Sequence, residues 1–214
     1  LDTAFHRYQA PPAILTATFT NDATVTAYLH SEGIHAIVHN KKGWIVSNNA
    51  FLSLQIPHIH ILPQIGPLLA EESLLTQKHV TDNYYTRLSS RHFRNQLHRN
   101  PAHYKDFATL AESTWQGLQI RPIDPETLKL LVRDGDFTAE VGWMGHGLQM
   151  WLQTMWFLAK TPSTSTVVLD EPDVYMHPDL QRKLYRLVKA RFSQAIIATH
   201  SVEIMAEADP SDIL

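Results

Sequence analysis

Two adjacent carboxylates, Asp170 and Glu171, follow an apolar run and stand directly before a proline. A histidine, His200, ends a second apolar run 29 residues after Glu171. Neighbouring residues of an extended segment point their side chains in different directions, so one carboxylate can hold a metal ion while the other faces a water molecule. The pattern therefore indicates a site where a metal ion, a water molecule and an imidazole meet.

The segments around these residues predict a β-α-β unit. The runs "STVVLDE" (165–171) and "QAIIATH" (194–200) lack polar alternation, which is typical of strands buried on both faces of a parallel sheet. Residues 179–192 carry an apolar helical stripe and predict the crossover helix. Since functional groups gather at the carboxyl ends of parallel strands, we expect His200 to face Glu171 across a small gap.

A plainer interpretation exists for each residue taken alone. A lone Asp-Glu pair is typical of a loop that caps the next turn, and a lone histidine is more often structural. The apolar run before Asp170, the proline after Glu171 and the run "ATHS" at the second strand end favour a functional site.

Two glycines precede the apolar segment 148–160, which predicts a buried helix because it is apolar nearly all round. Gly145 and Gly147 flank His146, and a helix start preceded by glycines is a ready anion site. The alternative is a tight turn that only leads into the helix.

The earlier part of the chain predicts a β-rich lobe followed by helices. Strands are expected at 13–19, on both sides of the "NKKG" turn within 34–49, and at 58–63, with a short helix at 21–33 capped by Asp22 and closed by Gly33. Further helices are expected at 71–100, 101–117 and 124–135, the last capped by Asp124 with Pro125 in its first turn.

A basic stripe is expected on the first of these later helices, because its members are spaced by four, three and four residues. It consists of Arg87, Arg91, Arg94 and His98. Such a stripe can touch a phosphate backbone, and a solvated face paired with nearby acids is at least as good an interpretation.

The composition suits one globular domain, or one domain with a small subdomain: 214 residues, 44% hydrophobic and 18% charged. The chain has no cysteine, which excludes disulfides and cysteine-ligated zinc. The net charge of −3 argues against a surface that attracts nucleic acid everywhere. Without a long apolar run or a signal-peptide layout, we expect a soluble cytoplasmic protein that does not bind membranes.

The combination of "VVLDEP", "HP" and "ATHS" resembles the ATP-binding-cassette (ABC) class of ATPases. "VVLDE" looks like the Walker B strand of that class, and "ATHS" looks like its switch-histidine segment. "DEPDVYMHPDLQRKL" and "IIATHS" are similar to the branch with RecF-like, chromosome-maintenance and OLD-family ATPases. A transporter motor domain is disfavoured, because "VYMHP" stands where transporters usually have serine-alanine-leucine-aspartate. The resemblance is specific over 165–205.

The resemblance implies a role for each residue of the site. Asp170 would hold the Mg²⁺ bound to ATP, Glu171 would polarise the attacking water as general base, and His200 would contact the γ-phosphate. Asp173 would lie in a loop that meets a partner subunit. The loop of Gly145, His146 and Gly147 would be the signature motif, which touches the partner's γ-phosphate. The family often has a serine in this loop, so His146 would donate in its place.

A P-loop, G-x-x-x-x-G-K-[ST], does not occur in the sequence. Either the P-loop lies upstream of Leu1 in a longer parent, or the protein is a degenerate ATPase. The retention of Asp170, Glu171 and His200 favours a truncated parent, and so does a first residue other than methionine.

The expected fold is therefore α/β: an ABC-ATPase-like P-loop NTPase fold with a mostly parallel core sheet and a helical insert. Residues 1–67 would form the remainder of an N-terminal β-rich lobe, 68–146 a helical subdomain leading to the signature loop, and 147–214 the α/β core.

The expected function is ATP hydrolysis, with ATP and Mg²⁺ as cofactors, in DNA repair or anti-phage defence. ATP would be sandwiched in a homodimer or higher assembly and would control a partner or fused nuclease, or DNA engagement. The alternative is a non-hydrolysing module that binds a partner through the same fold.

Overall fold

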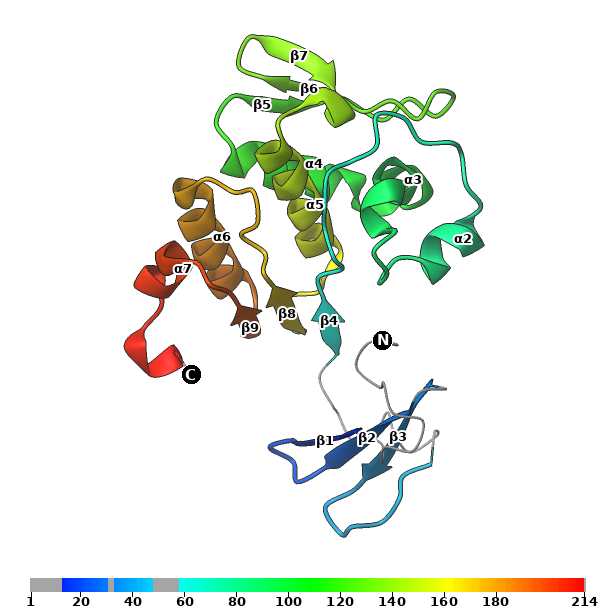
Figure 1. The fold of residues 1–214 in the computed structure, drawn as a ribbon, viewed down its shortest axis with the longest axis vertical. Helices are drawn as coiled ribbons and strands as arrows, with labels where there is room; N and C mark the ends of the chain where they lie inside the picture. The colour runs from blue at the N-terminus through cyan, green and yellow to red at the C-terminus, as the bar shows by residue number, and fades with distance from the viewer. Residues whose placement is uncertain (1–12, 31–32, 48–57, 214) are drawn as a thin grey trace. The chain divides into compact units, whose positions relative to one another are not determined.

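The computed structural model describes residues 13–30, 33–47 and 58–213 (Figure 1). Its contacts divide the chain into two compact units, Leu1–Pro57 and His58–Leu214. The finer division at residues 67 and 146 stays a prediction. Among the described residues, no helix has the length and apolar character that spanning a membrane requires.

The first unit holds a three-stranded antiparallel sheet in the order β1-β2-β3. Its strands are β1 (Ala13–Thr18), β2 (Thr24–His30) and β3 (Gly33–His39). The helix predicted at 21–33 is therefore wrong. Thr24, Val25 and Thr26 are β-branched residues that favour a strand, and Asp22 lies in the preceding turn with φ 61° instead of capping a helix.

The "NKKG" turn is confirmed. The side chain of Asn40 accepts hydrogen bonds from the backbone N–H groups of Lys42 and Trp44, at 2.9 and 3.1 Å. Gly43 has φ 76°, a conformation that glycine adopts without strain. The strand expected after the turn is reduced to one bridge between His39 and Ile45 within the described residues, and residues 48–49 lie outside them.

The second unit contains the predicted parallel sheet. Its order is β4-β8-β9, with β4 (Ile59–Ile61), β8 (Thr166–Asp170) and β9 (Gln194–Ala198) all parallel. The crossover helix α6 (Pro178–Arg191) joins β8 to β9, as expected, and α7 (Val202–Glu207) and η5 (Pro210–Asp212) follow β9. The "HP" pair starts α6, because His177 caps the helix and Pro178 takes its first position.

Within the second unit, described residues cover only one face of this sheet. Val167 and Leu169 of β8 are fully buried in the core, on the face where α6 contributes Leu184 and Val188. On the opposite face Ile196 of β9 is 54% exposed. The second unit by itself therefore does not bury β9 on both faces, in contrast to the prediction from the sequence.

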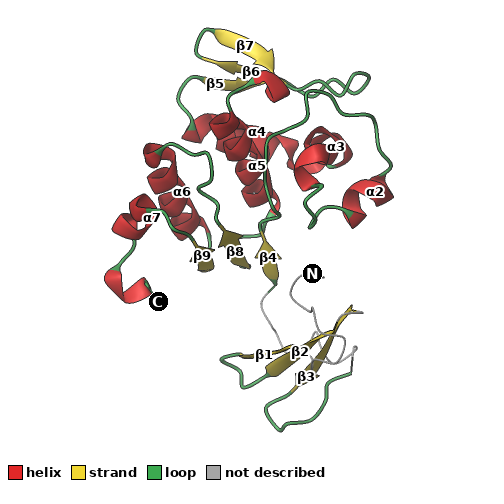
Figure 2. Cartoon of the chain, in the orientation of Figure 1, coloured by secondary structure: helices red, strands yellow, loops and turns green. Residues whose placement is uncertain are grey.

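The core of the unit surrounds α5 (His146–Lys160), which is buried along its length, as predicted. Helix α4 (Tyr104–Thr114) packs beside it, and Phe107 of α4 meets Trp156 of α5 edge to face at 5.7 Å. Figure 2 shows these helices between the two sheets of the unit.

A second antiparallel sheet, in the order β5-β6-β7, replaces the helix predicted at 124–135. It consists of β5 (Leu118–Ile120), β6 (Leu131–Asp134) and β7 (Phe137–Glu140), followed by η4 (Val141–Trp143). Asp124 caps only a turn, and Leu128 leaves the helical region with φ 52°. Leu128, Leu130 and Val132 are buried at alternate positions, which is a strand's period of two.

The helix predicted at 71–100 is broken into α2 (Gln77–Asp82), η2 (Ser89–His92) and α3 (Phe93–Arg99), with η3 (Pro101–His103) before α4. The proposed basic stripe is wrong, because its members do not share one helix. Arg94 is also buried: its guanidinium lies 3.1 Å from Glu72 and 2.6 Å from Glu140.

Replacing Arg94 should strongly destabilise this unit. The Glu72 side chain is 1% exposed, so Arg94→Met would leave a buried carboxylate without its cation. We expect a loss of about 3–5 kcal/mol in the free energy of unfolding, measured by urea denaturation. The exposed Arg91 is the matched control, and Arg91→Met should change it by less than about 0.5 kcal/mol. Equal losses in both variants would contradict a structural role for Arg94.

Candidate functional site

The structure brings Glu171 and His200 together at the carboxyl ends of β8 and β9. Asp170 of β8 pairs with Ala198 of β9, and the N–H of Glu171 donates to the carbonyl of Ala198 at 2.8 Å. His200 follows Ala198 by two residues, and its Nε2 lies 3.5 Å from Glu171 Oε1. The predicted juxtaposition of these two side chains is therefore present.

The backbone at Glu171 is in the left-handed region, with φ 46°. This conformation costs a residue with a side chain about 1–2 kcal/mol. The chain turns sharply there as it leaves β8, and the carboxylate faces His200 on the neighbouring strand end. Strain of this kind is common at functional sites, and in this chain it also occurs in the turns of Asp22 and Leu128.

Asp170 is a suitable ligand for a cation. It is exposed, and its carboxylate has no hydrogen bond or ion pair with any other residue that the structure describes. No cluster of three or more acidic or histidine residues suited to a metal occurs among the described residues. One exposed carboxylate can still take part in holding Mg²⁺, which is often bound by one or two carboxylates while substrate phosphates and water complete its coordination.

Asp173 connects the loop after β8 to the loop after β9. The hydroxyl of Thr199 donates to Asp173, and Thr199 Oγ1 accepts from the N–H of Ser201 at 2.9 Å. Ser201 caps α7 and donates to Gln181 of α6 at 2.6 Å. Thr199 and Ser201 flank His200 and hold its loop, and sequence analysis did not single them out although both lie in the "ATHS" run.

The glycine loop before α5 lies against the same segment. Gly145 is the N-cap of α5 and provides no side-chain cap, so the first N–H groups of the helix stay available to an anion. The ring of His146 meets that of Tyr175 edge to face at 5.5 Å. A Cβ at Gly147 would lie 3.0 Å from the carbonyl oxygen of Tyr175. The helix begins at His146, two residues earlier than predicted.

The predicted site residues thus form two groups joined by residues 171–176. Asp170, Glu171 and His200 make up one group, at the sheet edge. The glycine loop contacts the far end of the same segment through Tyr175. No direct contact between the two groups is present among the described residues.

Gln64 lies at the same sheet edge. It follows β4, which runs parallel to β8, and the N–H of Leu62 donates to the carbonyl of Val168 at 2.9 Å. The exposed Gln64 side chain comes two residues later. The surrounding sequence, "LPQIGP", does not resemble a known functional motif. Only the strand order puts Gln64 at the sheet edge where the acids lie.

Two kinds of comparison find similar proteins. The chain is similar in fold to a crystal structure of an SMC head bound to the C-winged helix domain of ScpA, with a TM-score of 0.55 and 16% identity over 89% of this chain. It covers 64% of that protein's chain. It is also similar to an SMC head from Pyrococcus furiosus bound to the C-terminal domain of ScpA, with a TM-score of 0.50, 13% identity, and coverage of 89% of this chain and 69% of that one.

A search of curated proteins finds no match. The SMC-head likenesses bear on the fold, and they confirm the ABC-like α/β architecture, with antiparallel sheets beside the parallel one. A family model described as "AAA domain, putative AbiEii toxin, Type IV TA system" matches residues 57–206. Because this match spans more than half of the 214 residues, the chain belongs to this family of AAA-type ATPase domains.

Proposed function

We propose that this chain carries the hydrolytic residues of an ATPase that works as a dimer. The observation that supports this most directly is the meeting of Glu171 and His200 at 3.5 Å on two parallel strand ends, beside the free carboxylate of Asp170. One carboxylate for a cation, a second for a water and an imidazole for a phosphate are the groups that metal-assisted phosphoryl transfer to water requires.

In the proposed reaction Glu171 accepts a proton from a water molecule. The oxygen of that water attacks the γ-phosphorus of ATP, and the bond from this phosphorus to the oxygen of ADP breaks. His200, whose side chain is 95% exposed, is open to donate a hydrogen bond to the γ-phosphate. Asp170 would hold Mg²⁺, which when bound neutralises charge on the phosphates. Thr199 and Asp173 hold the two loops in register.

The partner subunit would present its ATP to the start of α5. The free N–H groups after Gly145 and the exposed imidazole of His146 are donors suited to a γ-phosphate. Since Tyr175 contacts both His146 and Gly147, a partner that engages the glycine loop would also press on the loop that carries Glu171. Assembly and hydrolysis would be coupled through this segment.

The P-loop would come from a further segment that covers the bare face of the parallel sheet. Parallel sheets are normally covered on both faces. On the uncovered face Ile61 and Ile196 are 50% and 54% exposed, and the register places them on either side of Val168. Each isoleucine is already about half buried, so covering the exposed half would contribute about 1 kcal/mol per side chain to the association. We propose that a lobe with the P-loop packs there.

This proposal predicts that the 214-residue chain binds ATP poorly by itself. Joined to a segment of its parent that carries a P-loop, it should bind Mg-ATP at least ~100-fold more tightly, because P-loop N–H groups and a lysine hold the phosphates. Fluorescence titration with an ATP analogue measures both affinities.

A variant on the bare face tests the docking itself. Ile196→Asp should prevent the gain in affinity, whereas the exposed Ser193, which precedes β9, serves as the control in Ser193→Asp. Micromolar ATP affinity of the unassisted chain would show that a phosphate site other than a P-loop is present.

The biological setting is also proposed. The family description names a toxin of a type IV toxin–antitoxin system, which supports a defence role over DNA repair. ATP-driven dimerisation would then control a nuclease, a toxic activity or DNA engagement. A non-hydrolysing binding module is the second candidate, favoured by the missing P-loop motif. ATP hydrolysis by the P-loop-containing protein would support the ATPase, and ATP binding without hydrolysis would support the binding module.

A further inference from the structure

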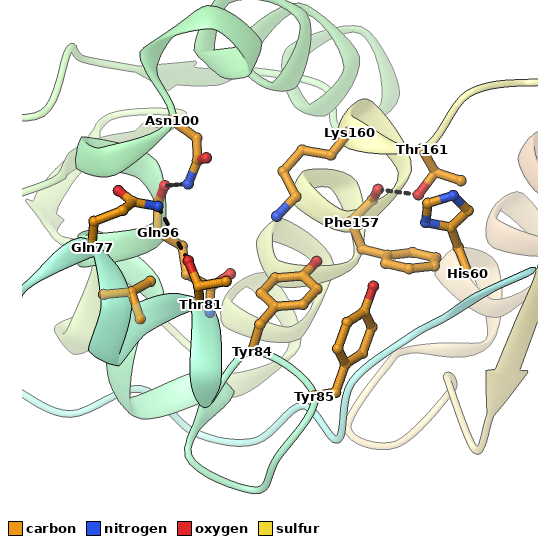
Figure 3. Close-up of a pocket in the computed structure, with 11 residues that line it drawn as sticks. His60, Gln77, Thr81, Tyr84, Tyr85, Gln96, Asn100, Phe157, Lys160 and Thr161 are labelled. Atoms are coloured by element: carbon orange, nitrogen blue, oxygen red, sulfur yellow. Dashed lines mark hydrogen bonds between the residues drawn. The ribbon is translucent and has the colours of Figure 1, made fainter. Parts of the chain in front are cut away.

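A pocket of about 290 Å³ opens at the end of α5 that lies opposite the candidate site (Figure 3). Lys160, which lines it, follows His146 by 14 residues, or about 21 Å along the helix axis. The pocket is lined by α2, the turn after it, α3, the end of α5 and one residue of β4: His60, Gln77, Val80, Thr81, Tyr84, Tyr85, Gln96, Asn100, Phe157, Lys160 and Thr161.

Lys160 is a cation without an anionic partner. Its Nζ lies 3.9 Å from the centre of the Tyr84 ring and 5.0 Å from that of Trp156, and it has no hydrogen bond or ion pair with any described residue. No aspartate or glutamate is among the described residues that line the pocket. Burial lowers the pKa of Lys160 to about 8, while the two rings attract the ammonium and oppose that change.

Two tyrosine hydroxyls add hydrogen-bond donors to the pocket. The hydroxyls of Tyr84 and Tyr85 have no hydrogen-bond partner within the described chain, and Figure 3 shows both rings in the pocket. Burial raises the pKa of Tyr84, so its hydroxyl keeps its proton at neutral pH. By contrast, the amide of Asn100 and the hydroxyl of Thr161 already donate to backbone carbonyls, both at 2.8 Å.

We propose that this pocket binds a small oxyanion, a phosphate or carboxylate group of a ligand, with Lys160 as its charge partner and the Tyr84 and Tyr85 hydroxyls as donors. The described lining has a positive charge and no acidic residue, so an anion is the ligand that complements it. A partly buried ammonium has lost part of its hydrating water, and a negatively charged ligand stabilises it most strongly. His60 of β4 also lines the pocket, on the side of Thr161.

The test is a calorimetric titration of the full chain with inorganic phosphate and, separately, acetate, at constant ionic strength in chloride. The solution contains no Mg²⁺ and no nucleotide, so the result does not depend on the ATPase proposal. We expect saturable binding to the wild type and at least ~10-fold weaker binding to Lys160→Met, the scale of a charged hydrogen bond. Lys160→Met keeps an unbranched apolar side chain over the rings.

Lys78 provides the matched control, because it is exposed and pairs with Asp82 on α2. Lys78→Met should bind the anion as the wild type does. Affinity should also fall as the pH rises through about 8, since the ammonium is the form that binds. If only phosphate saturates, the pocket is specific for phosphate groups. If acetate also saturates, the pocket accepts carboxylate groups as well.

Chemical labelling checks the proposal on the unaltered protein. Acetylation of lysines, read by mass spectrometry, should be slowed at Lys160 by the bound anion and unchanged at Lys78. The proposal is overturned if neither anion saturates, if Lys160→Met binds as well as the wild type, or if the anion leaves Lys160 labelling unchanged.

Discussion

Glu171→Gln is expected to reduce the steady-state ATPase rate of the P-loop-containing protein at least ~100-fold, the scale of a lost general base. ATP binding should persist, because the amide keeps the size of the carboxylate and Asp170 is untouched. Glutamine cannot take a proton from water, so the enzyme should stop in its ATP-bound state. The same variant should accumulate as a dimer with ATP and Mg²⁺, visible by light scattering.

Glu126→Gln is the control for this experiment, because Glu126 is an exposed glutamate in the turn before β6. It should leave the rate unchanged. A wild-type rate in Glu171→Gln would remove the base assignment and favour the non-hydrolysing module. A Glu171→Gln protein that no longer binds ATP would instead point to a role for Glu171 in holding the nucleotide.

The strained backbone at Glu171 is consistent with a glutamate side chain that is needed at this position. Glycine would relieve the left-handed conformation, with φ 46°, at no steric cost. The chain carries a glutamate there, next to His200 and one residue after the free Asp170. Asp22 and Leu128 adopt similar φ values in turns, so the strain supports a functional position for Glu171 only together with its 3.5 Å distance to His200.

The β-α-β unit and α5 could be predicted because their patterns are local and uninterrupted. Residues 167–169 form an unbroken apolar run, and α5 is apolar nearly all round, so burial is expected whatever the neighbours are. Parallel strand order then places Glu171 beside His200 without further information. This part of the site could therefore be derived from the sequence.

The two wrong helices share a cause. Asp22 and Asp124 are residues that cap helices and also close turns, and the sequence alone does not distinguish the two uses. At 124–135 the alternation of Leu128, Leu130 and Val132 carried the strand signal, and the presence of Asp124 and Pro125 outweighed it.

Contacts between distant segments that are not neighbouring strands could not be predicted. Arg94 has the spacing of a surface stripe, yet Glu72 and Glu140 enclose it from segments that lie 22 and 46 residues away. Likewise, Tyr175 meets the glycine loop only because α5 and β8 pack together. Such pairings depend on the tertiary fold, and periodicity contains no information about them.

Gly147→Asp is expected to abolish ATP-driven dimerisation while leaving the chain folded. The new carboxylate would stand in the first turn of α5, where an acid is favourable for the helix. It would face the phosphate proposed to bind there, and two anions at close range repel strongly. The new Cβ would approach the carbonyl of Tyr175 at 3.0 Å, which the exposed loop can accommodate by a small shift. Light scattering with ATP and Mg²⁺ measures the dimer, and circular dichroism the fold.

Gly147→Ala separates charge from bulk, because it makes the same contact with Tyr175 and carries no carboxylate. It should retain much of the dimerisation that Gly147→Asp loses. His146→Ala tests the donor: if the imidazole replaces the missing serine, ATPase activity should fall while nucleotide affinity at the P-loop stays the same. Normal dimerisation and turnover in Gly147→Asp would show that the glycine loop is only a turn into α5. The Tyr175 contact would then be packing, and coupling between the partner and Glu171 would have to run through another surface.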